Sequence, residues 1–332
     1  IHAQDLVIQD ADGGGVDIPL GLHVVNQPRN EVWETGAEPS DLVAGRAGGG
    51  DGAAKLVPLL AQVAAAEKAG DGLRRVRTAA QEIAHRIALL NDANLRALQA
   101  CLDHAHAEGA TRYALLGDLV GYGADPGAVV DRIMQLTDAG ALALQGNHDA
   151  MAVTPPVEIK TVGDSTATWT HRELMPDQRD WISRLPLTVQ HESALFVHAS
   201  ANEPHLWRYV YDARAAKDSL DGAAAWPGVH YVFGGHVHLQ TLYYQGAGGQ
   251  LMPFVPQPGI SIPVAKHRKW LATVGSAGQP RDGNTHAMYA LFDMGRAQLT
   301  FHRVAYDHFA AAAAIRRVGL HEFFADRLER GR

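Results

Sequence analysis

Carboxylate, amide and imidazole side chains come directly after five short apolar stretches of this chain. The stretches are 87–90, 113–116, 141–144, 194–197 and 230–233, and the polar residues that follow them include Asp92, Asp118, Asn147, His198, His236 and His238. Oxygen and imidazole ligands without thiolate suit Mn, Fe or Zn better than Ca or a structural zinc. A carboxylate such as Asp118 can bridge two ions about 3.5 to 4 Å apart, which lowers the pKa of a shared water and clamps a phosphoryl group. The pattern therefore predicts hydrolysis of a phosphate ester.

The apolar stretches alternate with segments of helical periodicity from Arg86 onward. This alternation is typical of strands covered by helices, and it predicts an α/β fold. Ligand sites in layered α/β proteins collect at the carboxyl ends of strands. We therefore expect the polar residues that follow the five strands to lie close together in space.

Four motifs, in order along the chain, carry a resemblance to a known family. GDLVGYG (117–123), GNHD (146–149), VHAS (197–200) and GGHVH (234–238) resemble the calcineurin-like metallophosphoesterase superfamily, and GSAGQPRDGN (275–284) resembles its bacterial phosphodiesterase-like branch. The resemblance runs from about Arg86 to Arg332. It implies a four-layer α/β sandwich of two mixed β-sheets flanked by helices, in a metallophosphoesterase domain that we place at 83–332.

The resemblance also implies a set of metal ligands. In this family pattern Asp118 would bridge two divalent ions of the Mn, Fe or Zn type. The second metal site would be completed by Asn147, His198 and His236, and the first would contain Asp92 and His238.

His148 and Asp149 are the catalytic candidates that the resemblance implies. His148 would face the substrate and protonate the leaving oxygen or hold the phosphoryl group, and Asp149 would orient its ring. An imidazole suits this role because it titrates near neutrality and a neighbouring carboxylate fixes its tautomer. Tyr122 and Arg281 are candidates for substrate binding. The alternatives are packing for the Tyr122 ring, and for Arg281 an ion pair with Asp282 or a backbone contact.

The first motif departs from the family pattern. The family places Asp-x-His after its first strand, whereas the corresponding stretch here, LLNDANLRAL, is two residues shorter. Depending on where the gap falls, the histidine is absent or Asn94 stands in its position. An amide oxygen binds these metals more weakly than imidazole, so Asn94 is a weak ligand and the first site is predicted to be weak or vacant. Asp92 and Asn94 are also good N-cap residues for the helix expected over 94–107, and both roles stay open.

Composition narrows the class of protein. The 332 residues carry a formal net charge of −7 and no long basic run, which argues against binding to long nucleic acids or anionic membranes. No apolar run approaches the roughly 20 residues of a membrane span, and we expect a cytoplasmic protein. Cys101 falls on the apolar face of the 94–107 helix, which predicts a small core residue and not a reactive thiol. The oligomeric state does not follow from the sequence.

Residues 1–82 are predicted to be an N-terminal extension and helical linker of unknown role. Gly, Asp and Pro are frequent up to about residue 52, and two Ala-rich amphipathic patterns follow at 53–69 and 73–84.

An aromatic stretch follows the strand that ends before His198. Trp207, Tyr209 and Tyr211 alternate with other residues. This alternation favours a strand with one buried face over a surface that stacks on substrate.

The leading hypothesis is a metal-dependent phosphoesterase that acts on a phosphodiester or a small nucleotide. Protein serine/threonine phosphatases of the family, the first alternative, usually show Asp-Arg-Gly after the motif of the bridging aspartate and a Glu that ends the next motif. Here the motifs read GDLVGYG and GNHD, which favours a phosphodiesterase. The missing imidazole motivates a second alternative, an impaired or non-catalytic member that binds a nucleotide or a partner.

Overall fold

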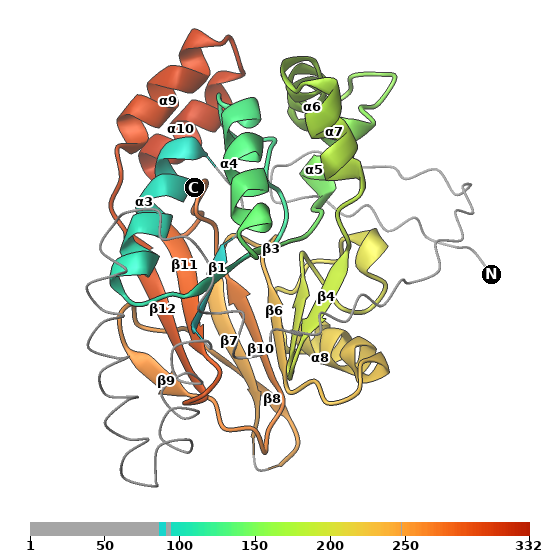
Figure 1. The fold of residues 1–332 in the computed structure, drawn as a ribbon, viewed down its shortest axis with the longest axis vertical. Coiled ribbons are helices and arrows are strands. Elements are labelled where there is room, and N and C mark those ends of the chain that lie inside the picture. Colours follow the sequence, from blue (N-terminus) through green and yellow to red (C-terminus); the bar gives the residue numbers. More distant parts are fainter. Residues whose placement is uncertain (1–85, 91–93, 247) are drawn as a thin grey trace, which may run out of the picture.

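Two β-sheets packed face to face form the centre of the fold (Figure 1). The structure is a computed structural model that describes residues 86–90, 94–246 and 248–332. The predicted N-terminal extension at 1–82, with its two helical patterns, and Asp92 lie outside the described residues.

Each sheet contains six strands and mixes parallel with antiparallel pairs. The first sheet has the order β3 (Leu142–Ala143), β2 (Arg112–Leu115), β1 (Arg86–Leu90), β11 (Ala287–Asp293), β12 (Gln298–Val304) and β9 (Ser261–Pro263). The second has the order β4 (Thr188–His191), β5 (Ala194–Val197), β6 (Tyr231–Gly234), β10 (Trp270–Val274), β7 (Gln240–Gln245) and β8 (Leu251–Phe254). The parallel neighbours are β1, β2 and β3 in the first sheet and β5, β6 and β10 in the second. All five predicted strands are confirmed, and the two mixed sheets match the predicted fold class.

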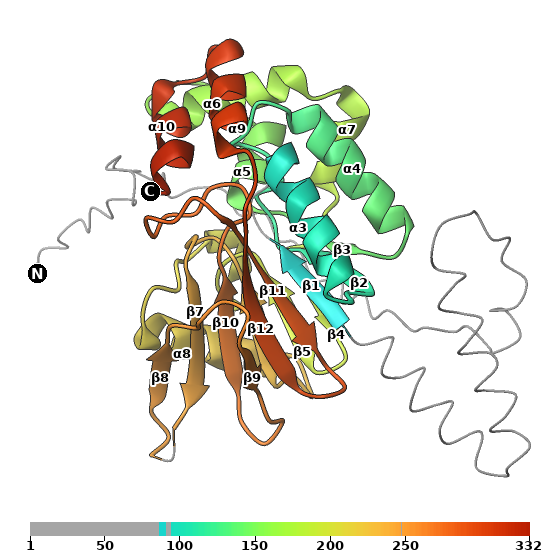
Figure 2. The same cartoon turned by 90° about the vertical axis from the view of Figure 1, so that its left-hand side faces the viewer.

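Helices cover the outer faces of the two sheets (Figure 2). The described α-helices are α3 (Leu95–Ala107), α4 (Pro126–Asp138), α5 (Asn147–Val153), α6 (Val162–Glu173), α7 (Pro176–Ser183), α8 (Ala213–Gly222), α9 (His308–Arg317) and α10 (Glu322–Arg330), with short 3₁₀ turns η2 (Pro204–Leu206) and η3 (Ala223–Ala225). Side chains of α3 and α4 pack on the first sheet, and α8 packs on the second. No helix in the described ranges is both long enough and apolar enough to cross a membrane.

The strand β1 shows why its apolar run is continuous. Ile87 and Leu89 belong to the core between the two sheets, whereas Ala88 and Leu90 belong to the core under α3. Successive side chains of a strand point to opposite faces, so a strand covered on both sides is apolar throughout. The same burial applies to β5, whose four residues are all buried.

Asn94 is the N-cap of α3. Its Oδ1 accepts a hydrogen bond from the backbone N–H of Ala97 at 2.9 Å, and its Nδ2 donates to the carbonyl of Gly278 at 2.9 Å. The expected helix after Asn94 is therefore confirmed, together with the capping role of this residue. Cys101 is buried in the core beneath the same helix, as predicted, and burial raises the pKa of its thiol.

A buried polar cluster joins α3 to the first sheet. The ring of His302 stacks on Tyr289, with centroids 4.7 Å apart, and Tyr289 shares a 2.8 Å hydrogen bond with Nδ1 of His104. Nε2 of His302 is buried without a hydrogen-bond partner among the described residues. Burial, with a smaller effect of the His104 charge, lowers the pKa of His302 to about 4.

Acidification should therefore weaken the fold through His302. Its pKa is lower in the folded chain than the ordinary value of 6.5, so the unfolded chain binds more protons between pH 6.5 and about 4. The stability that His302 contributes is complete above pH 6.5 and is lost as the pH falls through this window, by about 2 to 3 kcal/mol. Denaturant unfolding at pH 7 and pH 5 should show that the free energy of unfolding falls less for His302→Phe than for the unsubstituted chain. His106→Phe, at an exposed position of α3, is the control and should keep the original loss; equal losses for all three proteins would contradict the assignment.

Candidate metal centre

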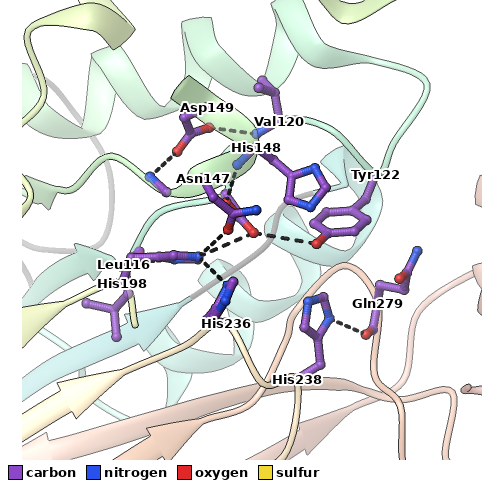
Figure 3. A network of polar contacts seen from close by, with 12 residues as sticks. Leu116, Val120, Tyr122, Asn147, His148, Asp149, His198, His236, His238 and Gln279 are labelled. Atoms are coloured by element: carbon purple, nitrogen blue, oxygen red, sulfur yellow. Dashed lines mark hydrogen bonds and ion pairs between the residues drawn. The ribbon is translucent and has the colours of Figure 1, made fainter. Parts of the chain in front are cut away.

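His198, which directly follows β5, presents one ring nitrogen to the centre of the site (Figure 3). Its Nδ1 lies 2.7 Å from the backbone carbonyl of Leu116, at the end of β2. The carbonyl can only accept, so Nδ1 carries the hydrogen and Nε2 of the neutral ring carries a lone pair. The second sheet thus directs a lone pair toward residues of the first.

Nε2 of His198 is surrounded by other potential metal ligands. It lies 3.1 Å from Oδ1 of Asn147, 3.0 Å from Nδ1 of His236 and 3.4 Å from Oδ2 of Asp118. Ligand atoms bound at about 2.0 to 2.2 Å to one ion lie about 3.0 to 3.5 Å from one another, which matches these spacings. Ligand atoms of Asp118, His198 and His236 all fall within 4.8 Å of one another, and these three side chains are buried. The donor set therefore fits a divalent cation.

Asp118 carries the negative charge of the site. Its Oδ1 accepts the backbone N–H of His148 at 2.9 Å, and its Oδ2 faces the hydroxyl of Tyr122 at 3.5 Å. Burial alone would raise the pKa of Asp118, but the positive charges that His198, His148 and His236 carry when protonated hold it well below the usual range. The carboxylate is thus ionised, as a metal ligand must be.

His236 and His238 follow β6 and are both buried. Burial lowers the pKa of each well below its usual range, and the Arg281 charge lowers both further, so both rings are held neutral. Nδ1 of His238 lies 2.8 Å from the backbone carbonyl of Gln279 and therefore carries the hydrogen, which leaves the lone pair on Nε2. Nε2 of His236 is buried without a hydrogen-bond partner among the described residues. Neutral imidazole is the form that binds metal.

Three of the predicted ligands have left-handed backbone conformations. The φ angles are 51° for Asp118, 63° for His236 and 56° for His238. A non-glycine residue in this region costs roughly 1 kcal/mol or more, and such residues cluster at functional sites. The fold therefore maintains strain at the residues that the sequence selects as ligands.

Glycines allow the ligand loops to approach closely. A Cβ at Gly117 would lie 2.7 Å from Nδ1 of His198 and 2.8 Å from the backbone nitrogen of Gly146. A Cβ at Gly146 would overlap the backbone nitrogen and Oδ1 of Asp118. The loops after β2 and β3 thus depend on the lack of side chains at these two positions.

His148 and Asp149 begin α5 beside the ligands. His148 is half-buried, and its ring lies 4.4 Å from the ring of Tyr122, measured between centroids. The Asp149 carboxylate accepts the backbone N–H groups of Gly146, at 2.8 Å, and Val120, at 3.2 Å (Figure 3). Burial and the nearby negative charge of Asp118 raise the pKa of Asp149. Asp149 thus holds together the two loops that carry Asp118 and His148, and its predicted action on the His148 ring stays a prediction.

Tyr122 and Arg281 are both brought to the edge of the centre. Tyr122 is buried against α9 and α10, and its ring lies edge-on to His238 at 5.3 Å. The guanidinium of Arg281 lies 5.9 Å from the centroid of the Tyr122 ring and donates to Oε1 of Gln279 at 3.1 Å. Tyr122 therefore packs in the core and also lies at the edge of the site. Asp282, the alternative partner considered for Arg281, forms an ion pair with Arg303.

The strand predicted for the aromatic stretch after His198 is wrong. Trp207 to Val210 form no regular structure, because a 3₁₀ turn opens at Pro204 and Trp207 takes a left-handed φ of 51°. The rings instead lie against the proposed ligands. Trp207 lies edge-on to His198 at 5.7 Å, and Tyr209 stacks on His236 with centroids 4.0 Å apart.

The first metal site is described only in part. His238 is in place beside Tyr122, but Asp92 lies outside the described residues. The Asn94 oxygen accepts from Ala97 as a helix cap, so any contact with an ion would use its remaining lone pair. Sequence reasoning missed Gln279, whose backbone carbonyl orients the His238 ring, although Gln279 stands within the GSAGQPRDGN motif. It also missed Arg327 of α10, which donates to Oε1 of Gln279 at 3.2 Å.

Comparison with known proteins identifies the family of this fold. The model of the family described as calcineurin-like phosphoesterase matches residues 85–240. A crystal structure described as a metallophosphoesterase from Sphaerobacter thermophilus is 30% identical, with a TM-score of 0.67, and the match covers 75% of this chain and 99% of that one. The chain belongs to the calcineurin-like phosphoesterase family. Family membership and the buried ligand cluster together support a metal-dependent phosphoesterase.

Two further relatives have no established activity in their descriptions. An uncharacterised protein of Methanocaldococcus jannaschii is 29% identical to this phosphoesterase over 254 residues, which are 74% of this chain and 98% of that protein. A hypothetical protein of Pyrococcus horikoshii OT3 is 18% identical with a TM-score of 0.60, over 74% of this chain and 98% of that one, and it supports the fold alone.

Gly146→Ala should damage the metal centre directly. The new methyl group would overlap Asp118, so the Asp118 carboxylate must shift from its present position among the ligands. We expect the affinity for Mn²⁺ to fall at least tenfold, as measured by calorimetry with metal analysis after dialysis. Gly163→Ala in α6 is the matched control, because the nearest atom to its new methyl would be Oγ1 of Thr161 at 3.5 Å. Unchanged Mn²⁺ affinity in Gly146→Ala would show that Asp118 does not contribute to a metal site.

Proposed function

We propose that this protein hydrolyses a phosphodiester or a small nucleotide at a centre of two divalent ions. The observation that carries the proposal is the group of ligand atoms around Nε2 of His198, at 3.0 to 3.4 Å from His236, Asn147 and Asp118. Asp92 and His238 would complete the first site. Divalent ions bound there would polarise a phosphoryl group and lower the pKa of water.

His148 is proposed as the proton donor to the leaving oxygen. His148 and Asn147 are half-buried, whereas Asp118, His198 and His236 are fully buried, so a substrate would approach past His148. Its backbone N–H donates to Asp118, which holds the His148 backbone beside the proposed metal ligands. The contact with the Tyr122 ring restricts the ring further. These contacts orient the imidazole in advance, which general acid catalysis requires.

An aromatic stack supports a substrate with a flat group beside the phosphate. Tyr209 stacks on His236, and Tyr211 stacks on Tyr209 with centroids 5.0 Å apart and planes 10° apart. Tyr211 is 50% exposed, so the stack runs from the buried ligands toward solvent. Nucleobases and aryl groups stack on such rings. This favours a nucleotide or diester over a phosphorylated protein side chain.

Turnover of bis(p-nitrophenyl) phosphate tests the activity. We expect release of p-nitrophenolate that depends on added Mn²⁺ and stops after chelation. No turnover with Mn²⁺, Fe²⁺, Co²⁺ or Zn²⁺ would contradict the proposal. Metal analysis tests the alternative of an impaired binding protein, since two bound ions per chain favour the enzyme and one or none favours the alternative.

His148→Ala should separate catalysis from metal binding. Loss of a general acid typically costs 10²- to 10⁴-fold, so we expect kcat to fall at least about 100-fold while metal content stays the same. His205→Ala, at an exposed position of η2, serves as the control and should keep full activity. Loss of metal from the His148 variant would assign the ring to the metal centre instead.

A further inference from the structure

Asn94 joins three parts of the fold through its side-chain amide. Its Oδ1 accepts from the backbone N–H of Ala97 at 2.9 Å, and its Nδ2 donates to the carbonyl of Gly278 at 2.9 Å and to the hydroxyl of Tyr306 at 3.3 Å. The Ala97 N–H can only donate and the Gly278 carbonyl can only accept, which fixes the orientation of the amide. The cap of α3 is thus tied to the loop between β10 and β11, which contains Gly278.

The same loop orients the ring of His238. Gln279 directly follows Gly278, and its carbonyl accepts from Nδ1 of His238 at 2.8 Å (Figure 3). Two adjacent carbonyls of one loop therefore receive hydrogen bonds, the first from Asn94 and the second from His238. Because the peptide unit is planar, only the φ and ψ angles of Gln279 separate these two carbonyls. A displacement of the first carbonyl therefore also displaces the second.

Other contacts restrict the backbone of this loop. The backbone N–H of Gln279 donates to Oγ of Ser276 at 2.7 Å, and the following residue, Pro280, limits Gln279 to extended conformations. Ser276 and Gln279 are completely buried, and Asn94 is 4% exposed. A buried carbonyl that loses its donor is costly, so we expect the loop to shift when the amide of Asn94 is removed.

The position of the Gln279 carbonyl decides which ring nitrogen of His238 carries the hydrogen. The carbonyl can only accept, so it holds the hydrogen on Nδ1 and leaves the lone pair on Nε2. Without a fixed acceptor, a neutral imidazole divides between two tautomers, and only one of them has a lone pair on Nε2. The loop therefore prepares the ring for a metal ion.

We propose that Asn94 is a positioning residue for His238 and acts through Gly278 and Gln279. It holds the loop whose carbonyl sets the tautomer of the His238 ring. Asn94 thus prepares a ligand of the first metal site without being a ligand itself. This inference rests on the proposed function for the role of His238 as a metal ligand.

Asn94→Asp separates this role from the other two roles considered for Asn94. Asp caps helices as well as Asn does, and added ligand charge strengthens the binding of a cation. A capping role alone predicts no change, and a ligand role predicts tighter metal binding. The positioning role predicts loss of the single His238 tautomer, because Asp lacks the amide donor and turns an oxygen toward the Gly278 carbonyl. Asn94→Ser, which also keeps a good cap, repeats the test without the added charge.

Nitrogen-15 NMR of the imidazole groups measures the tautomer in the metal-free full chain. At pH 7 burial keeps the His238 ring neutral, and its signals are identified by their loss in His238→Gln. We expect essentially all of the ring population to carry the hydrogen on Nδ1 in the unsubstituted chain, and about two thirds or less in both Asn94 variants. Hydrogen on Nε2 in the unsubstituted chain, or an unchanged tautomer in a folded Asn94 variant, would overturn the proposal. Tighter Mn²⁺ binding by Asn94→Asp with an unchanged tautomer would assign Asn94 as a ligand instead.

Two variants control for indirect effects on the fold. Tyr306→Phe removes the other acceptor of the Asn94 amide and keeps the bond to Gly278, so the His238 tautomer should stay the same. Asp212→Ser exchanges one cap residue for another at the start of α8 and should also leave the tautomer unchanged. A mixture of tautomers in both controls would show a general loosening of the fold and would contradict a specific role of Asn94.

Failure of this proposal is distinguishable from failure of the proposed function, because the tautomer is measured without metal or turnover. An unchanged tautomer in the Asn94 variants of a chain that hydrolyses bis(p-nitrophenyl) phosphate removes only the positioning role. A mixture of tautomers in the variants of a chain without turnover supports the positioning role and contradicts the proposed hydrolysis.

Discussion

Crowding of electron-pair donors is the constraint on which the site depends. A carboxylate, an amide oxygen and a second imidazole meet around one nitrogen of His198, at separations of 3.0 to 3.4 Å. Without a cation, several of these atoms would direct lone pairs at one another in a region closed to water. The surrounding contacts maintain this geometry. The Leu116 carbonyl fixes the tautomer of His198, and left-handed backbone at Asp118 and His236 directs both side chains inward.

The close approach of the loops around the site also explains why they contain glycines and are joined by hydrogen bonds to backbone groups instead of by large side chains. Gly117 and Gly146 lie against each other and against the ligands, where a side chain would separate them. Asp149 connects the two loops instead, because its carboxylate accepts hydrogen bonds from a backbone N–H group of each. Burial and the nearby negative charge of Asp118 both raise its pKa. The fold therefore makes ionisation of Asp149 less favourable in order to hold two loops at a short distance.

Much of the fold and site could be predicted because the signals were local. Each apolar run is buried on both faces, so the five strands and the polar residues after them were visible in the sequence, and Asn94 caps α3 as its side chain allows. The alternation of residues predicted a strand at Trp207 that does not form. Its left-handed backbone ends the extended conformation there without changing the alternation in the sequence. Arg327 could not be predicted, since nothing in the α10 sequence indicates that it contacts Gln279, 48 residues earlier in the chain.

The ligand cluster takes its members from both sheets. Asp118 and Asn147 follow strands of the first sheet, whereas His198 and His236 follow strands of the second. An ion bound among them would act as a cross-link at the end of the sandwich, in addition to the apolar contacts between the sheets. The distance between the sheets would then set the size of the coordination sphere. Core residues such as Phe196 and Phe292, which are buried between the sheets, would influence which ion is preferred through the spacing that they impose.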